Sequence, residues 1–489
     1  MIVAIANQSA IAANRFGFGA RPGELAAIGS DPRSWLLAQI SAPYRAPAEL
    51  AALASGSLIL SSFLAARAAR AAQRKAAAQS AEPAQDATAD PVKEPRNAVR
   101  ELLLPHYVAQ AAARTRIVLA TEASFRERLV HFWSNHFAVS IDKPICLGIA
   151  GTLENEAIRP RIDGHFADLL LAVESHPAMI GYLDNQRSLG PNSEIGARVS
   201  RRRGAAAQAG GDGALLGKVG VNENLAREIL ELHTLGVDGG YSQADVTTFA
   251  AVLTGWSIGG GPGRYAEGEP GAFVFRSALH EPGAKTLLGR RYADDGMEQG
   301  RAVLRDLATR PATARHLATK LARHFVADEP PAELVDRLAR AYGASAGHLP
   351  TVYAALVNWD GAWREEPRKF KQPQEFVYSS LRALAVAPDE PKALLAPFAA
   401  LGQRHWNPGS PAGWPDRQAD WDGADALMQR IEWSVALAAR IGDAHSALGA
   451  ADTALGALAS RHTRSALENA ASGSQALALL LMSPEFQRR

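Results

Sequence analysis

Residues 221–236 read VNENLAREILELHTLG, and this stretch most clearly predicts the helical character of the chain. On a helical wheel of about 100° per residue, Leu225, Ile229 and Leu232 form one apolar stripe. Gly236 follows as the stop signal of the helix. An amphipathic helix of this kind buries one edge against other helices, so the pattern predicts a helical fold.

The polar edge of this helix is the first candidate site. Asn224, Glu228 and Glu231 fall within about 60° of one another on the wheel, with Arg227 beside them. Paired carboxylates one turn apart suit a metal ion or acid–base chemistry. The structural alternative is an Arg227–Glu231 surface ion pair. In a regular helix His233 lies on the opposite side, which makes it a poor partner for the carboxylates.

Composition limits the classes of function. The chain has 489 residues, with 52 Lys and Arg against 50 Asp and Glu, and a formal net charge of +2. This near balance gives no electrostatic case for a nucleic-acid or membrane-surface protein. The single cysteine, Cys146, excludes an intrachain disulfide and a multi-cysteine metal site. The ligands of any bound metal would therefore be His, Asp or Glu.

The organisation predicted along the chain is a mainly α, multi-helix single globular unit over residues 1–489. Residues 80–97 are polar and interrupted by prolines, which predicts a flexible hairpin tip. Residues 198–219 combine an Arg cluster with Gly and Ala, which we interpret as a flexible loop. Residues 257–292 alternate aromatic and polar side chains, which predicts a small β-hairpin excursion. No secretory signal is recognisable, so a cytoplasmic location is expected.

A second candidate site lies in residues 125–137, FRERLVHFWSNHF, which have the pattern of an amphipathic helix. His136 shares the wheel face of Phe132 and Trp133, so it is either a core histidine or a metal ligand. His131 and Asn135 fall instead on the polar side. The two histidines are five positions apart, so one helix does not direct both at one ion.

A third candidate site is the segment HEPGAK at 280–285, which places His280 and Lys285 in a Gly/Pro-rich loop. The alternative interpretation is a plain polar turn. Asp184 follows a predicted helix and could cap a helix or coordinate, with capping the simpler interpretation.

Several motifs recur together in this chain. They are FWSNHF at 132–137, NENLARE at 222–228, LGVDGGY at 235–241, HEPGAK at 280–285, KQPQEF at 371–376 and SPEF at 483–486. Their combination resembles the bacterial family catalogued as domain of unknown function 1800, over about residues 11–489. The resemblance implies a mostly helical single unit without an assigned activity.

The resemblance also implies a partner and a ranking of residues. Genes of the family often neighbour a sulfatase-like family that carries an export signal, so export in complex with such a partner is one expectation. Family members vary at the positions of His131 and His233, which implies that neither is central. Glu281 stands where an aspartate is common, so the carboxylate is kept but displaced by one methylene.

Two main functions follow from these observations, with a third behind them. The first is a metal-dependent hydrolase or oxidoreductase with a His/Glu site between helices. Its predicted residues are His136, Glu228 and His280 as divalent-metal ligands, Glu228, Glu231, Arg227 and Lys285 as catalytic groups, and Asn135, Asn224 and Asp184 behind the ligands. The second is a scaffold or escort of the sulfatase-like neighbour, with the tryptophan-rich loop at 403–422 as its interface. The third is an anion- or glycan-binding protein that uses the same loop.

Overall fold

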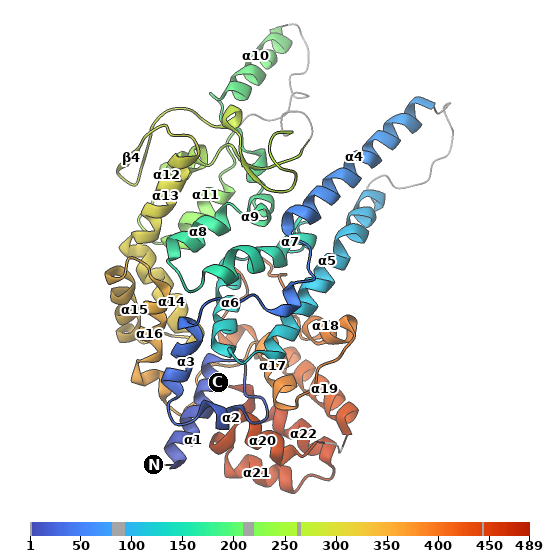
Figure 1. Ribbon diagram of the computed structural model, residues 1–489, viewed down its shortest axis with the longest axis vertical. Helices are drawn as coiled ribbons and strands as arrows, with labels where there is room; N and C mark the ends of the chain where they lie inside the picture. Colours follow the sequence, from blue (N-terminus) through green and yellow to red (C-terminus); the bar gives the residue numbers. More distant parts are fainter. Residues whose placement is uncertain (1, 81–92, 209–219, 262–265, 443–444) are drawn as a thin grey trace.

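The structure, a computed structural model, describes residues 2–80, 93–208, 220–261, 266–442 and 445–489. Helices dominate the described chain (Figure 1), which confirms the mainly α prediction. The predicted hairpin tip falls largely on residues 81–92, which lie outside the described residues.

The helices of the first half of the chain are α1 (Ile2–Ile11), α2 (Glu24–Ile28), α3 (Pro32–Ser41), α4 (Gly56–Ser80), α5 (Lys93–Ala120), α6 (Ser124–His136), α7 (Cys146–Thr152), α8 (Phe166–Glu174), α9 (Pro177–Tyr182), α10 (Glu194–Gln208), α11 (Asn224–Glu228) and α12 (Gln243–Val252). Those of the second half are α13 (Met297–Thr309), α14 (Pro311–Phe325), α15 (Ala332–Ala344), α16 (Leu349–Val357), α17 (Pro373–Ala383), α18 (Pro391–Ala400), α19 (Ala424–Ile441), α20 (Ala447–Ala454), α21 (Arg461–Glu468), α22 (Gly473–Met482) and α23 (Pro484–Gln487). Helix α10 corrects one expectation, because residues 198–208 continue a helix instead of forming a loop.

In the described ranges, three π-helical turns extend or follow regular helices. They are η1 (Ala12–Phe16), η3 (Leu153–Ile158) and η7 (Ile229–Thr234). Each turn buries a polar or charged side chain, namely Arg15, Glu154 and His233. Because π-turns are rare and often occur at functional sites, the buried polar side chains of these three segments are candidates for a functional role.

The β-structure lies where the sequence predicts it. Strands β1 (Trp256–Ile258) and β2 (Phe273–Phe275) pair antiparallel, with Ser257 opposite Val274. Strands β3 (Lys285–Leu287) and β4 (Arg290–Tyr292) form a second antiparallel pair. The described part of the excursion at 257–292 is therefore two separate two-stranded sheets.

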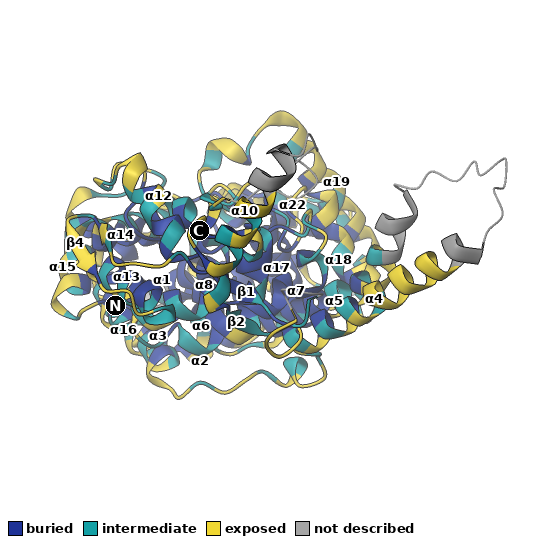
Figure 2. Ribbon diagram, turned by 90° about the horizontal axis from the view of Figure 1, so that it is seen from above, coloured by how far each residue is buried: buried dark blue, intermediate teal, exposed yellow. Residues whose placement is uncertain are grey.

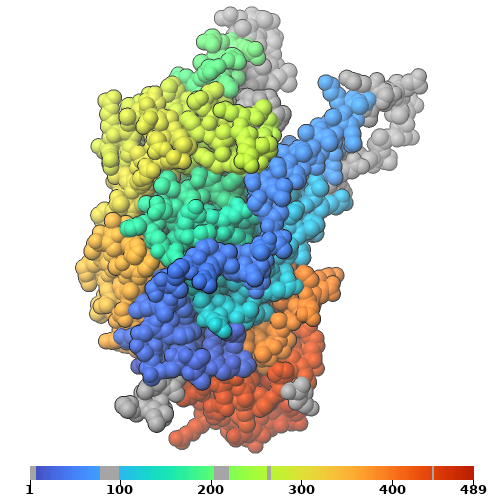
Figure 3. All heavy atoms as spheres, in the orientation of Figure 1, coloured from blue at the N-terminus to red at the C-terminus, as the bar shows by residue number. Residues whose placement is uncertain are grey.

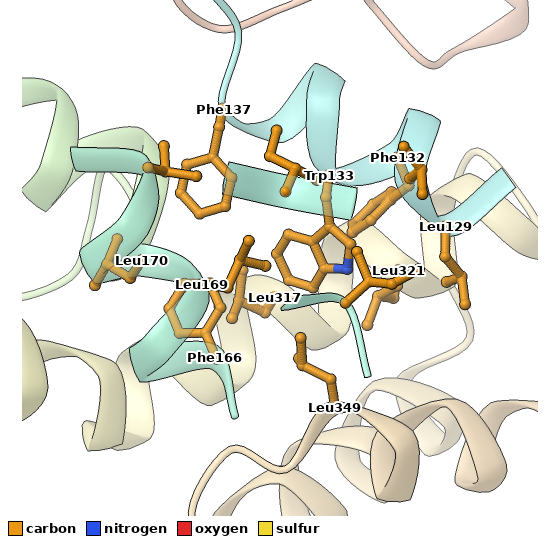
Figure 4. Close-up of a cluster of buried hydrophobic side chains, with 14 of the residues drawn as sticks. Leu129, Phe132, Trp133, Phe137, Phe166, Leu169, Leu170, Leu317, Leu321 and Leu349 are labelled. Atoms are coloured by element: carbon orange, nitrogen blue, oxygen red, sulfur yellow. The ribbon is translucent and has the colours of Figure 1, made fainter. Parts of the chain in front are cut away.

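Helix α6 contributes several side chains to the larger of the two apolar clusters found among the described residues. Its side chains at 129, 132 and 133 pack against α8, α14 and α16 (Figure 4). Trp133 is fully buried and donates a 2.6 Å hydrogen bond from Nε1 to the Tyr353 hydroxyl. The predicted apolar face of this helix is thus confirmed.

Helices α4 and α5 project together from the body (Figures 1 and 3). Much of α4 is exposed along its outer length (Figure 2). In the part of the chain that the structure describes, no helix combines the length and hydropathy that crossing a membrane requires.

Candidate functional site

The polar side of α6 faces the protein interior. Glu127 is buried and accepts two hydrogen bonds from Arg159, at 2.5 and 2.8 Å. The His131 side chain is only 9% exposed, and its Nε2 lies 3.6 Å from Glu127. His131 therefore lies beside Glu127, as the wheel places it, and charged side chains from η3 and its C-terminal side cover this polar side of α6.

The π-turn η3 supplies the second carboxylate of this group. Glu154 is fully buried and accepts hydrogen bonds from Arg114 Nε at 2.9 Å and from Trp406 Nε1 at 3.2 Å. Arg159 also reaches Glu154, at 3.3 Å. We call Arg114, Glu127, His131, Glu154 and Arg159 the ion-pair cluster. Burial lowers the pKa of His131 to about 4, so this imidazole is neutral at pH 7.

The ion-pair cluster contains a possible metal-ligand set. Ligand atoms of Glu127, His131 and Glu154 all lie within 4.8 Å of one another, the only such group of three His, Cys, Asp or Glu among the described residues. Two guanidinium groups already balance the two carboxylates, so a dication alone would leave a net charge of +2 in the interior. His131 Nε2 is buried without a hydrogen-bond partner.

The predicted metal ligands do not meet in such a group. His136 is buried, and its Nε2 donates to the His233 carbonyl oxygen at 3.1 Å. His280 Nδ1 donates to the Thr254 carbonyl oxygen at 2.9 Å. Glu228 is half-buried, and burial raises the pKa of its carboxyl group. The three residues occupy three polar environments, and their joint metal role stays a prediction.

The π-turn η7 changes the position of His233. Its side chain is buried, and Nδ1 donates a 2.7 Å hydrogen bond to the buried carboxylate of Glu174. The helical wheel assumes a regular helix, but this helix becomes π-helical from Ile229. The partner of His233 is thus Glu174 and neither Glu228 nor Glu231, and the expectation that His233 is not central to function stays a prediction.

The remaining predicted residues mostly have local partners. Arg227 pairs with Glu223 at 3.0 Å and donates to Gln243, in place of the expected pair with Glu231. Lys285 donates to the carbonyl oxygens of its own loop, at 2.7 Å for Glu281.

Other predicted groups lie at helix ends or near the surface. Glu231 is half-buried and hydrogen-bonded to Tyr241. Asn224 is exposed at the start of α11. The Asp184 side chain pairs with Lys143 and caps no helix, which corrects the capping interpretation. The proposed catalytic roles of these residues stay predictions.

Asn135 anchors the loop of residues 403–422, which we call the tryptophan loop. Its amide nitrogen donates to the Trp414 carbonyl oxygen at 2.9 Å, and its oxygen accepts from the Trp414 N–H at 2.7 Å. Trp406 and Trp421 are 7% and 8% exposed. These two tryptophans pack inward, and the role of the loop as a partner interface stays a prediction.

Two cavities lie beneath this loop. A central cavity of about 60 Å³ is lined by residues that include Arg114, Arg128, His131, Asn135, His324 and Glu375. A side cavity of about 270 Å³ is lined by residues that include Asn135, His136, Lys320, His324, Trp414 and Asp416. Asn135, His324 and Trp414 line both cavities, so the two spaces adjoin.

His324 is the titratable group shared by the two cavities. Its Nδ1 donates to Asp416 at 3.0 Å, and its Nε2 is buried without a partner. Burial opposes ionisation of Asp416, but His324 and Lys369 outweigh it and lower the pKa of that carboxyl group. Burial also lowers the pKa of His324, so the ring is neutral and Nε2 carries a lone pair.

Lys320 lies one turn before His324 on α14. Burial lowers the pKa of its ammonium group to about 8, although Asp416 partly opposes this shift. An uncharged imidazole and an ammonium group of lowered pKa in one cavity are the groups that acid–base catalysis needs.

Sequence reasoning missed His324, Lys320 and Asp416. One signal was present, because His316, Lys320 and His324 are spaced i, i+4 and i+8 on a single helix. Asp416 lies 92 positions from His324 and carries no local signal.

Comparison with known proteins places the chain in a family. The family model described as a protein of unknown function (DUF1800) matches residues 11–488, so the chain belongs to this family. No curated protein and no solved structure matches the chain.

Proposed function

We propose that this protein is a hydrolase in which His324 acts as general base beneath the tryptophan loop. The observation that carries the proposal is the His324–Asp416 pair. The second imidazole nitrogen is buried without a hydrogen-bond partner, and the His324 side chain lines both cavities. A carboxylate on Nδ1 fixes the ring and its tautomer, as it does for catalytic histidines generally.

The reaction would begin with a water held next to His324 Nε2. The imidazole accepts a proton while the water oxygen attacks an electrophilic carbon, phosphorus or sulfur atom of the substrate. Lys320 is positively charged at pH 7, so it stabilises the developing negative charge and protonates the leaving group. Asp416 stabilises the imidazolium that forms.

A substrate panel tests this function. We expect the protein to hydrolyse at least one of p-nitrophenyl acetate, phosphate and sulfate, with a rate that falls by about 10²-fold or more in His324→Gln. His462→Gln is the matched control, because His462 is exposed on α21. Hydrolysis of none of the three, or an unchanged rate in His324→Gln, would contradict the proposal.

A divalent metal at the ion-pair cluster is the second candidate, favoured by the short separations among Glu127, His131 and Glu154. Arg114 and Arg159 would orient the carboxylates, and an anion bound with the metal would balance its charge. Metal analysis of protein purified without a His-tag tests it. We expect one equivalent of Zn, Mn or Fe, lost in His131→Ala. A preparation that is empty and also rejects these added ions would count against it.

The partner role has a different surface in its favour. Met428, Ile431 and Val435 are exposed on α19 with spacing i, i+3 and i+7, which is typical of helix-mediated contacts. If the sulfatase-like neighbour binds there, Ile431→Asp abolishes its co-purification from native extract. Absence of the neighbour from pull-downs of the wild-type chain would remove this alternative.

A further inference from the structure

A large groove separate from the two cavities runs between α5 and α18. Its volume is about 1030 Å³, and α5 and α18 meet along it (Figures 1 and 3). Tyr107 lines the groove and contacts the ring of Trp406, with ring centroids 6.5 Å apart. Trp406 lines the central cavity, so this tryptophan lies between the groove and the cavity.

The groove is lined mainly by apolar side chains that are only partly covered. Leu104 and Val108 of α5, Leu147 of α7 and Leu395 of α18 are half-buried. An apolar channel of this size, at the upper end of the roughly 300–1,000 Å³ of small-molecule sites, favours a ligand with a long hydrocarbon part.

The charged groups of the lining are mostly cationic. Arg100, Lys392 and Arg404 are exposed, and the structure gives none of them an ion-pair partner in the described ranges. The one carboxylate, Asp142, already accepts a 2.8 Å hydrogen bond from Asn407. Three cations and one carboxylate leave a net charge of +2, which is complementary to an anionic ligand.

We propose that this groove binds a long-chain fatty acid. The hydrocarbon chain covers the half-buried leucine and valine side chains, and the carboxylate pairs with a groove cation. Arg404 is the strongest candidate, because it lies in the loop that follows α18 and a guanidinium group can bind a carboxylate through two hydrogen bonds. This proposal does not depend on the hydrolase chemistry of His324.

Calorimetric titration with palmitate, below its micellar concentration, tests the proposal. Ala396 and Ala393 are both exposed on α18, but only Ala396 lines the groove. We expect Ala396→Trp to fill the groove and weaken palmitate binding at least tenfold. Ala393→Trp, the matched control, is expected to change the affinity less than twofold.

The charge assignment is tested by a second ligand. Arg404→Gln is expected to weaken palmitate binding at least fivefold while leaving hexadecanol binding unchanged. The proposal is overturned if the wild-type chain binds no palmitate, or if the two alanine variants bind alike. It is also overturned if Ala396→Trp instead abolishes a self-association seen by sedimentation, because the groove would then hold a second copy of the chain.

Discussion

Closure of the tryptophan loop depends on one glycine, which makes Gly413→Ala an informative perturbation. Gly413 has φ +84°, and a Cβ there would lie 2.7 Å from Asn135 Oδ1 and still closer to the Asn135 carbonyl oxygen. Asn135 holds the next residue, Trp414, through two hydrogen bonds. The added methyl group therefore opposes the contact that anchors the loop to α6.

The change in the free energy of loop opening follows from two effects, the backbone strain at residue 413 and the loss of the hydrogen bonds between Asn135 and Trp414. A left-handed conformation costs an L-residue roughly 1–2 kcal/mol. Loss of the two hydrogen bonds costs roughly 0.5–1.5 kcal/mol each. Together these terms predict that the free energy of loop opening falls by about 2–5 kcal/mol, which is about 30-fold to several thousand-fold in the opening equilibrium.

Hydrogen–deuterium exchange of the Trp414 amide measures this opening directly. We expect its protection factor to fall by at least 30-fold in Gly413→Ala. Gly409→Ala is the matched control, because Gly409 is in the same loop and its Cβ would meet no atom within 4 Å. Equal protection of the Trp414 amide in the two variants would refute the reasoning.

Two further predictions concern stability. Arg159→Met removes both hydrogen bonds to buried Glu127, so urea unfolding should show that the free energy of unfolding falls by about 3–5 kcal/mol. Arg315→Met, the control in an exposed ion pair, should lower it by at most about 1 kcal/mol. A decrease below about 1 kcal/mol in Arg159→Met would show that the ion-pair cluster is not stabilising. Burial lowers the pKa of His131 and His316 to about 4, whereas the unfolded chain titrates near 6.5. Between pH 6.5 and 4 the unfolded state therefore binds more protons than the folded state. As the pH is lowered from 6.5 to 4, the free energy of unfolding should fall by up to about 3 kcal/mol per histidine. A His316→Gln variant should show a shallower fall, and an identical slope would contradict this assignment.

The fold class was predictable because helical periodicity and the β-like alternation are local properties. The apolar face of α6 and the strands at 257–292 are examples, since each depends on neighbours within a few positions. Residues 198–208 were misassigned because the glycine and charge content outweighed the helix propensity of the Ala and Arg residues.

The site was less predictable because it depends on distant residues and irregular turns. A wheel correctly separates His131 from the apolar face of α6, but it does not show that Glu154 and two arginines bury the polar face. No local pattern signals the π-turn η7, so the hydrogen bond between His233 and Glu174 was not predictable. The His324–Asp416 pair joins a helix to a loop, and only the tertiary structure brings them together.

The central claim is that His324 and Asp416 act as one catalytic unit, and a double-mutant cycle of hydrolysis rates tests it most directly. If they act together, the hydrolysis rate should fall by the same factor in His324→Gln and in the double variant that carries both His324→Gln and Asp416→Asn. Thermal melts check that each variant folds. Independent, additive losses in the two single variants would contradict the account.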